Sequence, residues 1–171
     1  MNWIRLSSLL LLWCTALLSA CKVSYSFTGA DVGEAETFSI VPFYNESLDG
    51  PADLAPLFTE SIRDYFQRNT PLDPVNQNGD LELSGSVARY LVEQVAQGAN
   101  ELQNAELQRL RITVEVEFIN NYNPDASFTR QFSSFQDFPA DQNLQDVEAE
   151  LIVVIFDQII NDVFNASVAN W

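Results

Sequence analysis

Four segments of the chain show the alternation of apolar and polar residues that is typical of half-buried strands. The predicted strands are 37–43, 80–95, 107–120 and 127–138. The alternation in the second of these breaks near Arg89 and Tyr90, which predicts a bulge or a bend. The fourth is rich in Phe and changes parity between Phe132 and Phe135, so we expect aromatic side chains on both of its faces.

Two other segments have the three- and four-residue apolar spacing of amphipathic helices. The first runs from Asp53, a candidate cap, to about Asn69. The second opens near Asn143 and runs to about residue 169. Its main stripe is Leu144, Val147, Leu151, Val154, Ile155, Ile159 and Val163. The element order predicts an α+β domain, a two-layer sandwich with two amphipathic helices packed on one face of a four-stranded mixed sheet.

The last helix carries a second apolar row, about 100° from the main stripe. Its members are Ile152, Phe156, Ile160 and Phe164. The row either widens the stripe that faces the core, where the first helix covers it, or forms a docking face for another protein. We keep both interpretations open and take the row as the candidate partner interface.

The N-terminus has the pattern of a bacterial lipoprotein signal. Arg5 supplies a positive charge, and the apolar stretch 6–18 is too short to span a bilayer. Small residues at 19 and 20 precede Cys21, the position at which a lipobox cysteine receives its acyl chains. The rival interpretation is an ordinary secretory signal followed by a coincidental cysteine.

This pattern predicts the organisation of the whole chain. We expect residues 1–20 to be a cleaved signal peptide, 21–36 to be the lipidated cysteine and a tether, and 37–171 to form a single domain. The lipid on Cys21 would then be the membrane anchor.

Composition excludes several classes of function. The formal charge is −16, and −17 once Arg5 leaves with the leader, which argues against nucleic acid as a partner because such binding depends on neutralising phosphates. The chain has no histidine, and Cys14 and Cys21 are lost to the leader and to the lipid. Cysteine or histidine catalysis and the usual zinc and copper sites are therefore not expected. A hydrolase that uses only carboxylates is the remaining enzymatic alternative, and we expect no enzyme, cofactor or metal.

Arginines are the scarce side chains that could recognise a ligand. By simple alternation, Arg109 and Arg111 lie on the face of their strand that is turned away from the core. Arg89 and Arg130 reach that face only if the parity slips at a bulge. A cluster there would offer donors to a phosphate or a carboxylate, and cross-strand pairing with nearby acidic residues is the alternative.

Three stretches of sequence carry a resemblance to a known family. They are YSFTG at 25–29, after the lipobox, VPFYN at 41–45 and VANW at 168–171. Together they resemble the LptE family of lipopolysaccharide (LPS) assembly lipoproteins, over essentially the whole mature chain and in the same element order.

The resemblance implies an α/β sandwich and a non-enzymatic role on the periplasmic side of the outer membrane. LptE proteins plug the barrel of LptD, assist its assembly and help to place LPS in the outer leaflet. Lys22 is not the acidic residue of an inner-membrane retention signal, in agreement with that location. We carry LPS phosphate contact over to Arg109 and Arg111, by strand and face. The alternative is a free-standing periplasmic lipoprotein that binds a lipid or a glycan on its sheet.

Overall fold

The structure, a computed structural model, describes residues 32–95 and 106–169. The leader 1–20, the lipidated Cys21 and most of the predicted tether lie outside the described residues, so their roles stay predictions. In chain order the elements are β1 (Thr37–Ile40), β2 (Tyr44–Asn45), α2 (Leu54–Asn69), β3 (Asp73–Val75), β4 (Leu81–Val95), β5 (Leu107–Asn120), the 3-10 turn η1 (Pro124–Ala126), β6 (Phe128–Pro139) and α3 (Leu144–Ser167).

The strands form one mixed sheet in the order β3–β1–β4–β5–β6, with β2 paired to β4 beyond the end of β1. β1 runs parallel to both β3 and β4, whereas β4, β5 and β6 form an antiparallel meander. Within these two described ranges the α+β class and the two helices are as predicted, but the sheet has six strands and not four.

The two additional strands are too short to show a periodicity in the sequence. The predicted strand 37–43 ends early, at Ile40, because Pro42 has no N–H to donate to a neighbouring strand. Pairing with β4 resumes at Tyr44, so β2 lies at the start of the segment that follows the predicted strand. β3 arises inside the predicted connector, where the N–H of Asp73 donates to the carbonyl of Glu36 at 2.9 Å. Both short strands satisfy backbone groups that β1 and β4 would otherwise leave unpaired.

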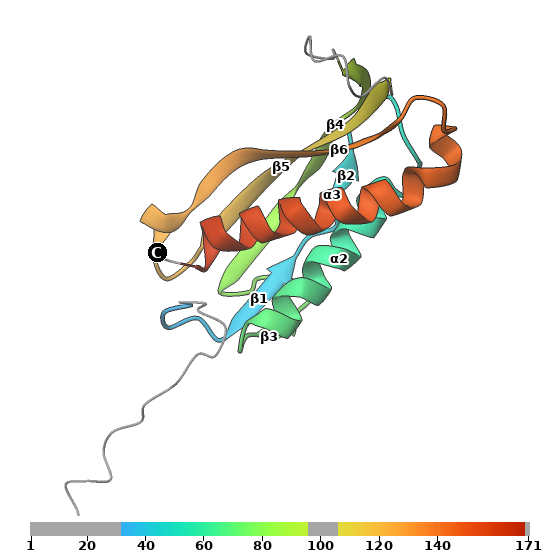
Figure 1. The fold of residues 1–171 in the computed structure, drawn as a ribbon. Helices are drawn as coiled ribbons and strands as arrows, with labels where there is room; N and C mark the ends of the chain where they lie inside the picture. Colours follow the sequence, from blue (N-terminus) through green and yellow to red (C-terminus); the bar gives the residue numbers. More distant parts are fainter. Residues whose placement is uncertain (1–31, 96–105, 170–171) are drawn as a thin grey trace, which may run out of the picture.

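Both helices lie side by side on one face of the sheet, α3 against β5 and β6, and α2 against β2 and β4 (Figure 1). Asn143 caps α3 through its side chain, which accepts from the N–H of Gln145 at 3.3 Å. Asp53 stands at the predicted cap of α2 but makes no side-chain capping bond there. Within the described ranges, no helix covers the opposite face, which we call the open face.

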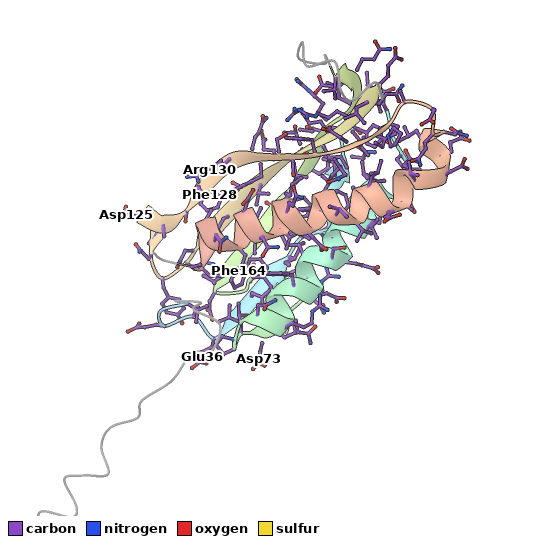
Figure 2. The ribbon with its side chains drawn as sticks, in the orientation of Figure 1. Glu36, Asp73, Asp125, Phe128, Arg130 and Phe164 are labelled. Carbon is purple, nitrogen blue, oxygen red and sulfur yellow. The ribbon has the colours of Figure 1, made fainter. Side chains whose placement is uncertain are left out.

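The second apolar row of α3 is buried, which corrects its prediction as a partner interface. Ile152, Phe156, Ile160 and Phe164 are each at most 5% exposed. The ring of Phe156 packs edge to face on the ring of Phe58 of α2, with 5.0 Å between the ring centroids. Phe164 lies between the two helices, and its ring centroid is 5.3 Å from that of Phe66 (Figure 2). The row widens the core-facing stripe because α3 packs on α2 as well as on the sheet. Val154, predicted in the main stripe, is 37% exposed.

The predicted bulge is present in β4, where the register with β5 shifts between Val87 and Arg89. The bulge turns the side chain of Tyr90 back into the core. The O–H of Tyr90 donates to Oε1 of Glu148 on α3 at 2.5 Å. Burial and this acceptor raise the pKa of Tyr90 well above its ordinary value. Gly50 adopts a φ of 93° beside this ring, and a Cβ there would lie 2.8 Å from it, so only glycine fits.

The packed part of the chain begins earlier than the predicted boundary at residue 37. Ala35 is only 7% exposed, and Val32 packs against the core. The carboxylate of Asp80 accepts from the N–H groups of Glu36 and Thr37, at 3.0 and 2.9 Å, which ties the start of β1 to β4.

Candidate functional site: the open face of the sheet

The open face carries the alternate residues of the three long strands. In β5, one row is fully buried under the helices: Leu110, Ile112, Val114, Val116 and Phe118. The intervening residues, from Arg109 and Arg111 to Glu115 and Glu117, therefore project from the open face, as the alternation predicted. Charge is divided along this face, with the arginines toward one end of β5 and the glutamates toward the other.

The basic end is organised around the ring of Phe135. The guanidinium carbon of Arg109 lies 3.7 Å from the ring centroid, and that of Arg111 lies 5.0 Å from it. Arg109 also donates to both oxygens of Asp137, at 2.6 and 2.9 Å, while Arg111 makes one longer contact of 3.4 Å with Glu93. Cross-strand pairing with acidic residues, the alternative weighed from the sequence, is thus present at both arginines.

The electrostatics of this end follow from the bidentate pair. The bonds from Arg109 hold the pKa of the Asp137 carboxyl below its usual value, and the carboxylate in turn raises the pKa of Arg109. The Arg109–Asp137 pair is therefore ionised throughout the physiological range, and any anionic ligand must share the Arg109 guanidinium with a carboxylate already in place.

The other two candidate arginines, Arg89 of β4 and Arg130 of β6, lie on opposite faces of the sheet. Because the register shifts after Val87, Arg89 lies opposite Thr113, on the open face beside Arg111. Arg130 lies opposite Val116 on the helix side of the edge strand, 5.1 Å above the ring of Phe128 (Figure 2). The structure thus brings three of the four candidate arginines to one face.

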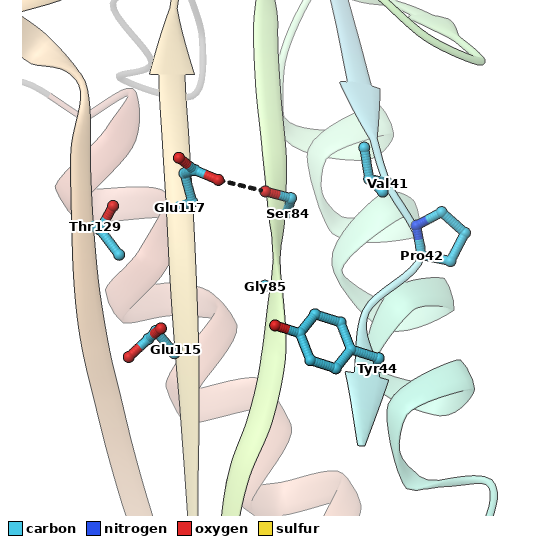
Figure 3. Close-up of a pocket in the computed structure, with 8 residues that line it drawn as sticks. All are labelled: Val41, Pro42, Tyr44, Ser84, Gly85, Glu115, Glu117 and Thr129. Carbon is cyan, nitrogen blue, oxygen red and sulfur yellow. Dashed lines mark hydrogen bonds between the residues drawn. The ribbon is translucent and has the colours of Figure 1, made fainter. Parts of the chain in front are cut away.

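A shallow hollow of about 250 Å³ marks the acidic end of the open face (Figure 3). Its lining is Val41, Pro42, Tyr44, Ser84, Gly85, Glu115, Glu117 and Thr129. The hydroxyl of Ser84 donates to Glu117 at 3.1 Å across β4 and β5. Gly85 allows the close approach of the backbones here, since a Cβ would lie 2.0 Å from the carbonyl oxygen of Glu115.

No pattern in the sequence predicts this hollow. Its residues come from β2, β4, β5, β6 and the connection between β1 and β2, and no local spacing connects them. The role of Phe135 as a platform was also missed, although the parity change in its strand had already placed an aromatic ring on this face. Among residues 32–95 and 106–169, no group of three or more His, Cys, Asp or Glu side chains is placed to hold a metal ion. None of the helices in the same ranges is long and apolar enough to cross a membrane.

Comparison with known proteins decides the family. The family model described as "LptE: Lipopolysaccharide-assembly" matches residues 35–167, which is nearly the whole described domain. The chain belongs to the LptE family. The resemblance seen in the sequence is confirmed, and the LptE match begins at Ala35, which is itself buried in the core. No curated protein matches the chain.

Comparison with solved structures finds several that resemble this LptE-family domain at low sequence identity. The hypothetical protein CT253 from Chlamydia trachomatis is 9% identical with a TM-score of 0.52, covering 80% of this chain and 99% of its own. A neuraminyllactose-binding hemagglutinin homolog from Helicobacter pylori is 8% identical with a TM-score of 0.53, covering 84% and 91%. The rare lipoprotein B from Shewanella oneidensis is 13% identical with a TM-score of 0.44, covering 75% and 89%.

Proposed function

We propose that this LptE-family chain is an outer-membrane lipoprotein that plugs and helps to assemble an LptD-type barrel during LPS transport to the outer leaflet. In this proposal Cys21 carries the lipid anchor, the domain lies on the periplasmic side, and the chain catalyses no reaction. The observation that carries the proposal is the family match over residues 35–167.

The surface of the domain supports a role inside a barrel. The apolar row of α3 is buried in the core and adds no apolar area to the surface, and the chain carries a formal net charge of −16. The interiors of outer-membrane barrels are polar, and a polar plug can lie there without exposing apolar area to water. The lipobox supports the location, because two or three acyl chains hold a protein at a membrane durably.

A pull-down tests the proposal directly. The tagged, lipidated protein is isolated in mild detergent from its native outer membrane, and every retained protein is identified by mass spectrometry. We expect one large β-barrel protein in about equimolar amount. The Cys21→Ser variant is the control for anchoring and is expected to leave the outer-membrane fraction. A wild-type protein recovered without a barrel, especially with lipid bound, would contradict the plug role and favour the free-standing carrier.

A further inference from the structure

Strand β6 ends the sheet on one side and leaves a long free edge. It pairs with β5 over its whole length, and nothing in the described ranges pairs with its other side. The opposite end of the sheet is β3, which has only three residues and contains Pro74. A three-residue edge with proline is a protected edge, whereas the twelve residues of β6 offer a template for another strand.

The register shows which backbone groups face outward. In an antiparallel pair, opposite residues alternate between those that exchange two hydrogen bonds and those that exchange none. The N–H of Ala140 donates to the carbonyl of Glu106 at 2.8 Å, so in this register the even-numbered residues of β6 bond to β5. The odd-numbered residues direct their N–H and C=O groups away from the sheet. They are Thr129, Gln131, Ser133, Phe135 and Asp137.

Two further bonds agree with this assignment. The N–H of Asn121 donates to the carbonyl of Asp80. In the register of β4 and β5, the odd-numbered residues of β5 therefore form their backbone bonds with β4, and its even-numbered residues form theirs with β6. The carbonyl of Pro139, an odd residue of β6, accepts from Gln142 and not from β5. Proline also removes the N–H at this position, so the free ladder ends there.

The edge is accessible and carries little of the usual protection, Arg130 being its one basic residue. Four of the five outward-facing residues are exposed, and Asp137 is half-buried. No lysine or proline interrupts β6 before Pro139, and its register with β5 runs without a bulge. Natural edge strands left in this state invite pairing with another chain.

The charge around the edge decides what kind of strand fits. On the helix side, Ser134 bonds to Gln158 of α3, so Val154 and Asp162 lie one turn away on the same flank. On the open face, Glu115 and Glu117 lie one strand behind the edge. Arg130 adds one positive charge on the helix side of β6, and the carboxylates of Glu115, Glu117 and Asp162 outnumber it along this edge. A strand added to β6 could also cover the 37% exposed Val154.

A second copy of this chain is poorly suited to pair with the edge of β6. Each copy has a formal net charge of −16, and such a charge keeps proteins apart by self-repulsion. A neutral or basic segment from a different protein gains both the backbone bonds and the charge complementarity.

We infer that the free edge of β6 binds an extended segment of the barrel partner, neutral or basic in net charge, as an added strand of the sheet. The inference rests on the proposed function and adds to it the surface and the mode of contact. Specificity would come from main-chain bonds at the odd residues, supplemented by the acidic side chains on either side.

A proline at Ser133 tests the backbone contact. The Ser133→Pro variant removes an outward N–H without removing a backbone bond to β5, so we expect it to fold. It also loses the side-chain bond of 3.1 Å that the Ser133 hydroxyl accepts from Thr113 of β5. Ser133→Ala is the matched control, since it loses the same hydroxyl and keeps the N–H. In the pull-down from native outer membrane, we expect Ser133→Pro to retain about tenfold less barrel and Ser133→Ala to differ from wild type by less than about twofold.

The outcomes separate this inference from the proposed function. If wild type retains no barrel, the proposed function and the inference both fail. If wild type and a folded Ser133→Pro retain the barrel equally, only the inference fails. Far-UV circular dichroism and the urea midpoint establish whether the variant is folded.

Photo-crosslinking tests the same edge without proline. A crosslinking amino acid replaces Gln131 at the edge or, as control, the exposed Leu57 on α2. We expect the Gln131 position to crosslink to a barrel peptide of zero or positive net charge, in at least about fivefold higher yield than the Leu57 position. Crosslinks to a second copy of the chain, to an acidic peptide, or in equal yield at the two positions would overturn the inference.

Discussion

The two arginines of β5 on the open face, Arg109 and Arg111, differ in how far their hydrogen-bonding capacity is used. Arg109 is held by two oxygens of Asp137 and by the face of Phe135, at 3.7 Å from the ring centroid. Arg111 has one contact of 3.4 Å with Glu93 and lies farther from the same ring. Arg111 therefore has more donors left for a ligand phosphate, whereas Arg109 acts mainly to position the cluster.

LPS contact through Arg111 is a prediction at this scale. We expect Arg111→Gln to weaken LPS binding by the purified barrel complex about fivefold, because it removes a charge-assisted donor. Arg68→Gln on α2 is the control, since it makes the same charge change where Arg68 already bonds the carbonyl of Asp64. Titration with LPS at fixed salt measures both. Equal affinities in the two variants would remove Arg111 from the proposed contact, leaving the plug role in place.

Helix α3 is the element that holds the two layers together. One side packs on β5 and β6 through residues such as Ile155 and Ile159, and the neighbouring side packs on α2 through Phe156 and Phe164. A helix that contacts two neighbours needs an apolar arc wider than a single stripe. This arrangement explains why two apolar rows occur on one helix without a docking face.

Truncation of Phe156 is predicted to act on stability. Phe156→Ala should lower the free energy of unfolding by about 3–5 kcal/mol, because it opens a cavity between α3 and α2. Val153→Ala, at a site that is 52% exposed, should change it by less than about 0.5 kcal/mol. Urea unfolding followed by circular dichroism measures both. A Phe156→Ala protein of full stability that no longer retains the barrel would restore the row as an interface.

On the scale of the whole molecule, acidity has two opposite effects on stability. The formal charge of −16 favours expansion by self-repulsion, which protonation relieves as the pH falls. Asp80 has the opposite effect, since its protonation at low pH lowers the stability of the folded state. Its bonds from the N–H of Glu36, and then from Thr37, hold the pKa of its carboxyl below the ordinary value, so folding favours its ionised form.

The pH dependence of Asp80→Asn is therefore predictable in sign. A carboxyl whose pKa is lowered on folding contributes stability that is complete above its unfolded pKa of about 3.9 and is lost as the pH falls through the folded value. We expect the urea midpoint of Asp80→Asn to lie below that of wild type by a constant amount above about pH 5, and the difference to shrink below about pH 4. Comparing the two proteins at each pH cancels the general charge effect, and a difference that does not change down to pH 3 would contradict the prediction.

Local patterns in the sequence were sufficient for the long elements and for their faces. The alternation in 107–120 corresponds to β5, the parity break near Arg89 corresponds to the bulge, and the open-face position of Arg111 follows from the same period. These features depend only on residues a few positions apart, because the side-chain period of a strand or helix is a local property. The family resemblance likewise came from short stretches that could be seen without coordinates.

What depends on distant residues was decided by the tertiary structure. The strands β2 and β3 form because β1 and β4 leave backbone groups that need partners. No pattern in residues 73–75 predicts a strand there. Whether the row at Phe156 was core or interface depended on where α2 packs, and which donors of Arg111 stay available depended on the register of β4 and β6. The free edge of β6 is likewise a property of strand order. Local sequence determines periodicity, whereas burial, pairing and edges arise only when separate segments meet, because they are relations between elements and not within them.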